Sequence, residues 1–378
     1  MTWDTTAVMQ NAVSLFKKKY PSVTVEMTYT PPVTQYISTL QERLLAGTAA
    51  DIFIYTAENL AQLNAGHFVM NLAPQPWVKY MATANRQYMS ADGGVWALSP
   101  AAWTAGVIYN TDILAKAGYK SIPTVWDDFL ELCAKLKRMG YTAYSDAGGN
   151  NWMALEGRIG SHYMQAYGRN VDPEIFAGKL SFQKAWDKPL TQYARLYSEE
   201  LVPASTVGLT GTEIDQQVAV GKQAMLGSGP WDVTSIQQDN PKISLFMGAV
   251  PSVPPGRPYW AGAPNEGWAV NAKARNPKAA LAFLSFLASP QGTAAYIAQE
   301  GFPSTMQNSS IPAKPALKAA AVAAKASQYY FTAVSWPSEY SAQLGVTLEA
   351  EIEALIEGKQ TVKQVLEAMD AEVERLRK

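Results

Sequence analysis

The chain has 378 residues and a formal net charge of -1, from 31 basic and 32 acidic side chains. This balance argues against nucleic acid or an anionic membrane as the main partner. Hydrophobic residues make up 48% of the sequence and charged residues 17%, as is typical of a well-packed globular protein rather than a disordered one. The length is too great for one ordinary hydrophobic core, so two domains are expected.

Cysteine usage and hydropathy exclude further classes. Cys133 is the only cysteine, which excludes an intrachain disulfide and a cysteine-based metal cluster, and its apolar helical position predicts an inert buried thiol. The sequence has no run of 18 apolar residues and predicts no membrane-spanning helix. Met1 to Asp4 have neither the basic nor the apolar region of a signal peptide. A cytosolic chain and a trimmed exported chain are therefore both open.

The N-terminal part of the chain alternates between helical and strand patterns. Apolar residues recur at helical spacing in some segments and form short runs in others. These patterns predict helices near 6–20, 34–46 and 58–65, and strands at 23–27, 51–55, 95–98 and 107–109, with a polar, aromatic segment around Trp103 between the last two. Such β–α alternation is typical of a parallel sheet covered by helices.

Beyond residue 110 the predicted elements are mostly helices. Asn110 begins a helix that ends at Gly118, and Thr124 is expected to cap the next helix, with Asp127 completing a capping box. Trp126 lies in that helix start, where a structural role is expected. The remaining predictions are helices at 124–139, 152–167, 182–199, 313–326 and 361–377, a helix opened by Asn276-Pro277, strands at 248–254 and 268–271, and a capping box of Thr361 with Gln364.

The stretch from 221 to 236 combines a strand, a turn and a helix start. An apolar run at 224–226 predicts a buried strand, which glycines and Pro230 then stop. Trp231 and Asp232 follow in the first turn of the next helix. A large aromatic ring and a carboxylate are thus expected where open α/β sheets bind their ligands, and core packing of Trp231 is an equal alternative.

Known catalytic motifs are missing from the sequence. It contains no G-x-S-x-G, P-loop, G-x-G-x-x-G or H-E-x-x-H motif. The two histidines, His67 and His162, lie among apolar or aromatic residues, and neither is expected to be catalytic or to bind a metal. A glycosidase pair of carboxylates such as Asp146 with Glu266 stays open, because only their separation would be informative.

Aromatic and polar side chains occur together at predicted strand ends and loops. A pyranose offers C–H groups on its face, which aromatic rings match, and hydroxyl groups at its rim, which Asp, Glu and Asn match. Each group alone is more often packing than ligand contact, but their shared placement favours a carbohydrate ligand. The groups are Trp3-Asp4, Tyr55 with Glu58 and Asn59, Trp103, Asn150-Asn151-Trp152, Trp231-Asp232, Trp260, Asn265-Glu266 with Trp268, and Trp336 with Tyr340.

Seven segments carry a family resemblance through their order and spacing. They are FKKKYP (16–21), LAGTAADI (45–52), VIYNTDIL (107–114), PTVWDDFLELCAKL (123–136), AMLGSGPW (224–231), GWAV (267–270) and NPKAALAFLSFLASPQ (276–291). With these segments nearly the whole chain resembles the extracellular solute-binding proteins of ABC importers, specifically the maltose-binding-like group (family 1) that carries sugars.

The resemblance implies an α/β fold of two lobes, the type II periplasmic-binding-protein fold, in which each lobe is a central sheet flanked by helices and several strands form the hinge. The first lobe would comprise 1–106 and 264–309, and the second 107–263 and 310–378. It further implies a non-catalytic periplasmic or extracellular monomer without cofactor or metal, with lipoprotein tethering open. Such a protein closes its lobes on a sugar and delivers it to an ABC importer permease.

The resemblance also implies ligand-binding positions. Trp231 lies in the segment GPW, which aligns with the family without a gap. Glu266 is predicted separately, from its place in a loop beside the expected hinge. The full predicted set is Asp4, Tyr55, Glu58, Asn59, Trp103, Asn151, Trp152, Trp231, Glu266, Trp336 and Tyr340. The many aromatic residues favour a di- or oligosaccharide over a single sugar ring.

Two alternatives stay open. One is a glycan-processing enzyme that uses a carboxylate pair. The other is a binding protein of the same fold for a polyol, a sugar acid or another non-sugar solute. An anionic ligand would require a basic pocket, and Arg158 and Arg257 are the nearest candidate cations.

Overall fold

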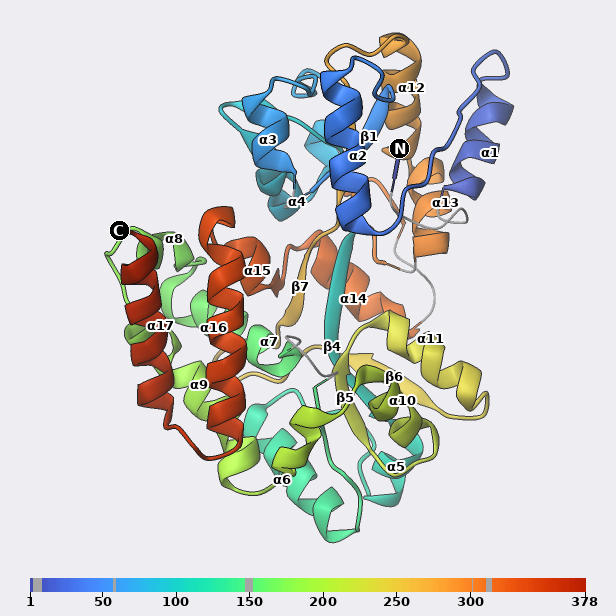
Figure 1. Cartoon of the computed structure of the whole chain (residues 1–378). Helices are drawn as coiled ribbons and strands as arrows, with labels where there is room; N and C mark the ends of the chain where they lie inside the picture. Colours follow the sequence, from blue (N-terminus) through green and yellow to red (C-terminus); the bar gives the residue numbers. More distant parts are fainter. Residues whose placement is uncertain (3–8, 57–58, 147–151, 301, 311–314) are drawn as a thin grey trace. The chain divides into compact units, whose positions relative to one another are not determined.

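The computed structural model describes residues 1–2, 9–56, 59–146, 152–300, 302–310 and 315–378. The chain divides into two units, each built from two stretches of sequence. The first unit comprises Met1–Trp103 and Pro264–Ser327, and the second comprises Thr104–Ala263 and Gln328–Lys378. The chain therefore passes between the units at three points, and Figure 1 labels the elements of both.

The first unit consists mainly of short helices around small sheets. Its elements are α1 (Gln10–Lys19), α2 (Val33–Leu45), β1 (Ile52–Tyr55), α3 (Leu60–Ala65), the 3-10 helix η1 (Val78–Tyr80), α4 (Thr83–Tyr88), β2 (Ser90–Ala91), β3 (Gly94–Val95), β8 (Gly267–Val270), α12 (Pro277–Leu287), α13 (Pro290–Glu300) and α14 (Pro315–Lys325). β1 and β8 pair antiparallel, with Ile52 opposite Val270, and β2 and β3 form a hairpin.

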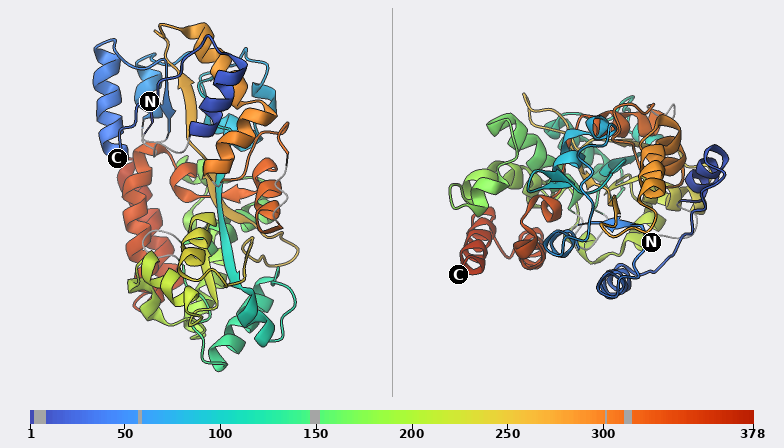
Figure 2. Two further views of the ribbon diagram at one scale, coloured as in Figure 1. Left: turned by 90° about the vertical axis from the view of Figure 1, so that its right-hand side faces the viewer. Right: turned by 90° about the horizontal axis from the view of Figure 1, so that it is seen from above.

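Helix α1 is held in the first unit by aromatic packing. The ring of Phe16 is fully buried and lies 5.0 Å from the ring of Phe283, at 88°, and 5.6 Å from that of Phe286. Edge-to-face contacts of this kind add to the free energy gained from apolar burial. Phe16 thus joins α1 to α12, and Figure 2 shows α1 beside the helices α12 and α13 in two further views.

The second unit holds the longer helices and the largest sheet of the described residues. Its elements are β4 (Ala102–Asn110, of which the first two residues belong to the first unit), α5 (Thr111–Lys116), α6 (Trp126–Arg138), α7 (Met153–Tyr167), α8 (Asp172–Phe176), α9 (Phe182–Ser198), the 3-10 helix η2 (Ala204–Gly208), α10 (Gly211–Ala219), β5 (Met225–Ser228), α11 (Pro230–Asp239), β6 (Leu245–Gly248), β7 (Trp260–Pro264), β9 (Tyr329–Tyr330), α15 (Thr332–Ser335), α16 (Ser338–Ile356) and α17 (Val362–Leu376).

Strand β4 is the centre of this sheet, in the order β5-β4-β7-β9 with β6 also on β4. Val107 lies opposite Gly227 of β5 and Gly248 of β6, and both pairings are antiparallel. β7 and β9 pair in parallel, with Trp260 opposite Tyr329. Figure 1 shows α16 and α17 side by side in the same unit, and both contact α9.

Helix α7 lies inside the second unit, and its glycines permit this. A Cβ atom on Gly157 would come within 2.5 Å of Val250, and one on Gly160 within 2.7 Å of the Cβ of Tyr330. Such distances are far below van der Waals contact, so only glycine allows the close approach. At these glycines the backbone of α7 therefore lies directly against neighbouring segments. Most side chains of the helix are buried.

Many local predictions are confirmed. Helices predicted at 34–46, 152–167, 182–199, 313–326 and 361–377 correspond to α2, α7, α9, α14 and α17. The Asn110 side chain accepts from the N–H groups of Asp112 and Ile113 and so caps α5. The run at 224–226 leads into β5, and Trp231 lies in the first turn of α11, as predicted. Cys133 is a buried free thiol, and burial raises its pKa.

Predictions that depend on distant partners were often wrong. The expected parallel sheet is wrong for β1, because its partner β8 arrives more than 200 residues later and runs antiparallel. No strand forms at Val23 to Met27 among the described residues, although alternate side chains there pack on the core. Trp103 lies within β4 rather than in a polar loop before a strand. The strand expected at 248–254 is displaced to β6, and α16 was not predicted.

The predicted cap of α6 is also wrong. The N-cap residue is Val125, and no side chain caps the helix. The N–H of Trp126 instead donates to the backbone oxygen of Ser252 at 2.8 Å, and the N–H of Ser252 donates to that of Thr124 at 3.1 Å. A backbone bridge thus holds the start of α6 and satisfies the N–H of its first residue, in place of the expected capping box.

We expect Thr361→Ala to lower the free energy of unfolding by about 1 kcal/mol, because it removes the cap of α17. The Thr361 hydroxyl accepts from the Gln364 N–H at 3.3 Å, and the Thr361 N–H donates to the Gln364 side chain at 2.9 Å. Urea unfolding would measure the change. Thr347→Ala, inside α16, is the matched control, because its hydroxyl only bonds back to the Gln343 oxygen. An equal loss in both variants would contradict the prediction.

Candidate functional site

The predicted ligand-binding residues divide between the two units. Asp4, Glu58 and Asn151 lie outside the described residues. Of the remainder, Tyr55, Asn59, Trp103 and Glu266 belong to the first unit, and Trp152, Trp231, Trp336 and Tyr340 belong to the second.

Tyr55 and Asn59 hold the turn between β1 and α3. The Tyr55 side chain is buried, and its hydroxyl accepts from the Asn64 amide at 2.8 Å. Burial raises the pKa of Tyr55. The Asn59 amide accepts from the Thr56 N–H at 3.0 Å and donates to the Ile54 oxygen at 2.9 Å. Both side chains thus have structural partners, and their contact with a ligand stays a prediction.

Glu266 lies in a polar group of the first unit. Its carboxylate accepts from the Tyr296 hydroxyl at 3.2 Å, and the Tyr296 ring meets that of Trp268 edge-on at 6.4 Å. The neighbouring Asn265 is fixed through its backbone, since its N–H donates to the Ala101 oxygen at 3.0 Å and its oxygen accepts from the Ser99 hydroxyl at 2.7 Å.

The Asn265 side chain is a candidate that the predicted set omitted. Its Nδ2 atom is buried and has no hydrogen-bond partner among the described residues. A buried donor without an acceptor costs free energy unless water or a ligand supplies one. The sequence grouped Asn265 with Glu266 but offered no sign of this unused donor, because burial is not visible in a linear pattern.

Trp231 combines an exposed ring with a fixed helix start. Its side chain is 40% exposed. Among the large apolar side chains that are exposed in the described structure, it is the aromatic one. A Cβ atom on Gly229 would lie 2.3 Å from the indole ring, so the glycine leaves room for the ring over the backbone. The Ser228 hydroxyl donates to Asp232, and burial raises the pKa of this carboxyl group. The ring thus offers an apolar face at the junction of β5 and α11.

Trp336 and Tyr340 are brought together by Phe176. The Trp336 ring is 4% exposed and lies 6.0 Å from the Trp186 ring at 28° and 6.3 Å from that of Phe176. Tyr340 stacks on Phe176 at 5.7 Å and 15°. Trp152, at the start of α7, is also buried. These rings pack in the core of the second unit, and their contact with a ligand stays a prediction.

Three buried carboxyl groups lie on α7 or near its ends in the sequence. Asp146 accepts from the hydroxyls of Tyr144 at 2.5 Å and Tyr193 at 2.9 Å, and from the Ala154 N–H at 3.2 Å. Burial raises its pKa to about 6. Both carboxylate oxygens of Asp146 accept hydrogen bonds from the protein, so Asp146 is a structural anchor. Its geometry gives no support to the alternative of a catalytic carboxylate pair with Glu266.

Glu156 and Asp172 anchor the segment at 330–335. Glu156 interacts with the Thr332 N–H at 3.1 Å and hydroxyl at 2.7 Å, and burial raises its pKa to about 8. Asp172 accepts from the hydroxyls of Tyr163 at 2.7 Å, Tyr330 at 2.8 Å and Ser335, and burial raises its pKa. These contacts fix the chain just before Trp336.

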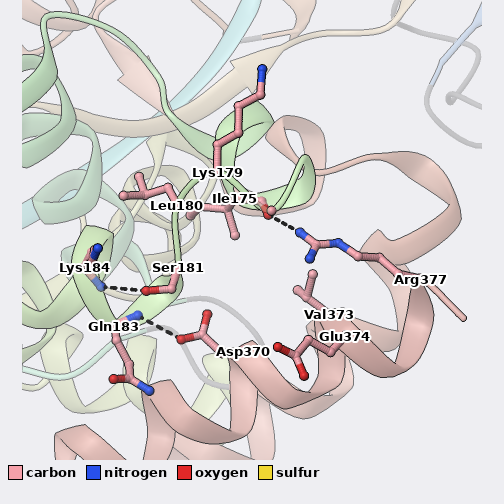
Figure 3. Close-up of a pocket in the computed structure, with 11 residues that line it drawn as sticks. Ile175, Lys179, Leu180, Ser181, Gln183, Lys184, Asp370, Val373, Glu374 and Arg377 are labelled. Carbon is pink, nitrogen blue, oxygen red and sulfur yellow. Dashed lines mark hydrogen bonds between the residues drawn. The ribbon is translucent and has the colours of Figure 1, made fainter.

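A polar pocket of about 400 Å³ lies between the start of α9 and α17. Figure 3 shows Asp370 directed at the first turn of α9, where it accepts from the N–H groups of Phe182 at 2.6 Å and Gln183 at 3.3 Å. Ser181 accepts from the Lys184 N–H. The N–H groups in the first turn of α9 are thus already hydrogen-bonded, so they are not available to bind an anion in the pocket. A second pocket, between α2 and α3, is mostly apolar and includes Asn59.

The residues that the structure describes include no group of three or more His, Cys, Asp or Glu side chains that could hold a metal ion. None of their helices is long and apolar enough to cross a membrane. His162 is half-buried, and burial together with Lys188 and Arg158 lowers its pKa to about 4. It is therefore neutral at pH 7.

Comparisons with known proteins agree with one another. The model of the family described as bacterial extracellular solute-binding protein matches residues 2–294. The multiple sugar-binding protein of Streptococcus mutans is 22% identical, over 79% of this chain and 71% of its own. The galactooligosaccharide-binding protein of Bacillus subtilis is 22% identical, over 75% and 66%. A family 1 extracellular solute-binding protein from Bifidobacterium longum subsp. infantis superposes with a TM-score of 0.84 at 25% identity, over 99% of this chain and 97% of its own.

We expect Glu156→Gln to remove a pH dependence of stability. The pKa of Glu156 is raised in the folded chain to about 8 from an ordinary value of 4.5, so its stabilising contribution is complete below about pH 4.5 and is lost as the pH rises through about 8. Between these values unfolding releases one proton, and the free energy of unfolding falls by about 1.4 kcal/mol per pH unit. The variant keeps an uncharged side chain that can hydrogen-bond to Thr332, and it lacks this decrease of the free energy of unfolding with pH.

Urea unfolding at pH 5, 7 and 9 would measure the difference between the two proteins. As the pH rises, the free energy of unfolding of the variant should increase relative to that of the wild type. Glu131→Gln, at an exposed position of α6, is the control and should follow the wild type. A constant difference between wild type and Glu156→Gln across this range would refute the assignment.

Proposed function

Because the chain belongs to the family of bacterial extracellular solute-binding proteins, we propose that it binds a carbohydrate outside the cytoplasmic membrane and does not transform it. The predicted α/β fold of the type II periplasmic-binding-protein class is confirmed by the superposition on a family 1 member. Two relatives of similar sequence are named for sugar binding, which supports a carbohydrate as the solute.

Trp231 is the observation that carries the proposal. An indole ring with an exposed face can stack on the C–H face of a pyranose. Its position follows from local structure: β5 ends at Ser228, Gly229 admits the ring, and Pro230 begins α11. The buried aromatic residues of the predicted set, Tyr55, Trp152 and Trp336, offer less surface to a ligand in this structure.

We propose that the two units are the two lobes of the binding protein. The predicted boundaries were 106/107, 263/264 and 309/310, while the units change at 103/104, 263/264 and 327/328. Closure of both lobes on the sugar would then create a form that an ABC importer permease recognises. In this proposal the protein acts as a monomer.

The alternatives receive less support. A carboxylate-pair enzyme would need a free acid and base, yet both oxygens of Asp146 accept hydrogen bonds from tyrosines. An anionic solute would need cations at the ligand, yet Arg158 is buried against Trp126 and Arg257 is exposed. A neutral sugar therefore fits best.

We expect Trp231→Ala to weaken sugar binding at least about tenfold, which corresponds to about 1.4 kcal/mol of lost stacking and apolar contact. Trp231→Phe, which keeps an aromatic face, should retain most of the affinity. Titration with mono-, di- and oligosaccharides, polyols and sugar acids, followed by tryptophan fluorescence and calorimetry, would measure this. Trp96→Phe is the control, because this half-buried indole bonds to the Ala91 oxygen in a hairpin. Equal affinity in wild type and Trp231→Ala would exclude Trp231 from the site.

We also expect no turnover of the bound sugar. The sugar recovered from the complex after prolonged incubation should be chemically unchanged, as product analysis by chromatography would reveal. Release of a shorter glycan by the wild type, abolished in Glu266→Gln, would favour the enzyme instead.

A further inference from the structure

Asp215 is a buried acid on α10, the helix that packs against α11 with its exposed Trp231. The residue is only 5% exposed. Its Oδ1 atom is buried and has no hydrogen-bond partner among the described residues. The ion pairs of the described residues include none with Asp215. A buried carboxylate without a cation is costly, whereas a protonated carboxyl group can use the unpartnered oxygen as a hydrogen-bond donor.

The helix α11 presents further oxygen atoms to Asp215. Asp232, Ser235 and Asp239 follow one another at spacings of three and four residues, which places them on one side of that helix. Asp232 and Asp239 are the charged groups that act on Asp215, and Ser235 hydrogen-bonds to it. α10 also packs on β5, and the residues of this strand, Met225–Ser228, have no titratable side chain. Within the described residues, Asp215 therefore faces like charges rather than a cation.

These surroundings keep a proton on Asp215 in mildly acidic solution. Burial, and after it the Asp232 carboxylate, raises the pKa of Asp215 to about 6 from an ordinary value of 3.8. On α10 itself, Glu213 is exposed and bonds to Thr210. Because the pKa is raised in the folded chain, the stability that Asp215 contributes is present at low pH and is lost as the pH rises through about 6. Above that pH the side chain is a buried anion beside a second carboxylate.

Asp232 connects this acid to the exposed indole ring. It directly follows Trp231 in the first turn of α11, and it accepts from the Ser228 hydroxyl at the end of β5. At the far end of the two helices, the Asn240 amide donates to the Ala219 oxygen at 2.8 Å. A neutral hydrogen bond thus joins the C-terminal ends of α10 and α11, whereas the start of α11, with its indole ring, lies where the two acids interact.

We propose that Asp215 is a positioning residue for Trp231. With a proton on its Oδ1 atom it donates a hydrogen bond to the Asp232 carboxylate and holds the start of α11 in place. Without that proton, repulsion between the two carboxylates displaces the helix start together with its indole ring. Sugar binding is then stronger in mildly acidic than in neutral solution. This effect on affinity rests on the proposed function, whereas the coupling of Asp215 to the ring does not.

Fluorine NMR of the protein labelled with fluorotryptophan tests this coupling without any sugar. The spectrum would be followed from pH 5 to pH 8, and the Trp231 resonance identified by its loss in Trp231→Phe. In the wild type we expect that resonance to shift with a midpoint near pH 6. In Asp215→Asn it should not shift in this range, because the amide has the same shape, donates at every pH and carries no charge.

Calorimetry with the tightest-binding saccharide of the panel described above measures the effect on affinity. The dissociation constant of the wild type should rise at least about threefold between pH 5 and pH 8, while that of Asp215→Asn should stay near the wild-type value at pH 5. Asp215→Ala, which removes both the donor and the charge, should bind more weakly than the wild type at pH 5. Asp187→Asn, at an exposed position of α9, is the matched control and should keep the wild-type pH dependence.

A wild-type Trp231 resonance that does not shift near pH 6, or an equal shift in Asp215→Asn, would overturn the proposal. An equal shift would assign the effect to Asp146 instead, whose pKa burial also raises to about 6 and whose carboxylate lies against Gly227 of β5. If a saccharide binds with the same affinity at both pH values, this inference fails and the proposed function stands. If the resonance shifts as expected but no saccharide binds at any pH, the proposed function fails and the coupling stands.

Discussion

The second unit depends on burying carboxyl groups whose partners are hydroxyl and N–H groups rather than cations. Asp172 accepts hydrogen bonds from Tyr163 of α7 and from Tyr330 of β9, and Tyr330 is 158 residues away from Asp172 in sequence. Glu156 bonds to Thr332, which is 176 residues further along the chain. A buried polar group is tolerated only if its hydrogen bonds are satisfied, so these networks require one particular arrangement of the chain. They hold α7 in place and position the segment that leads to Trp336.

The buried networks change the meaning of the many aromatic residues. Trp126, Trp186 and Trp336 are buried in the core of the second unit, where Trp186 stacks on Trp336 and Trp126 packs on Phe129. Rings that are used in packing cannot also stack on a sugar in the same conformation. The number of aromatic residues is thus no measure of how many sugar rings are bound. Trp231 differs because its ring is partly exposed.

The first unit positions its candidate residues by a neutral network. The Asn85 amide donates to the Ser99 hydroxyl at 2.8 Å and to the Ala101 oxygen at 2.7 Å, and the Ser99 hydroxyl donates to the Asn265 oxygen. These bonds fix the backbone beside Glu266 without an ion pair.

The sequence by itself determined the features whose causes are local. Helical periodicity, the capping box of Thr361 with Gln364, the Asn110 cap and the strand–turn–helix around Trp231 each depend on residues within a few positions of one another. The order and spacing of short segments also indicated the family. Only tertiary structure decided the direction of strand pairing, the backbone bridge that replaced the Thr124 cap, and which aromatic rings are buried. The physical reason is that each of these features depends on a partner far away in the chain, and a linear pattern carries no information about which distant segment lies beside it.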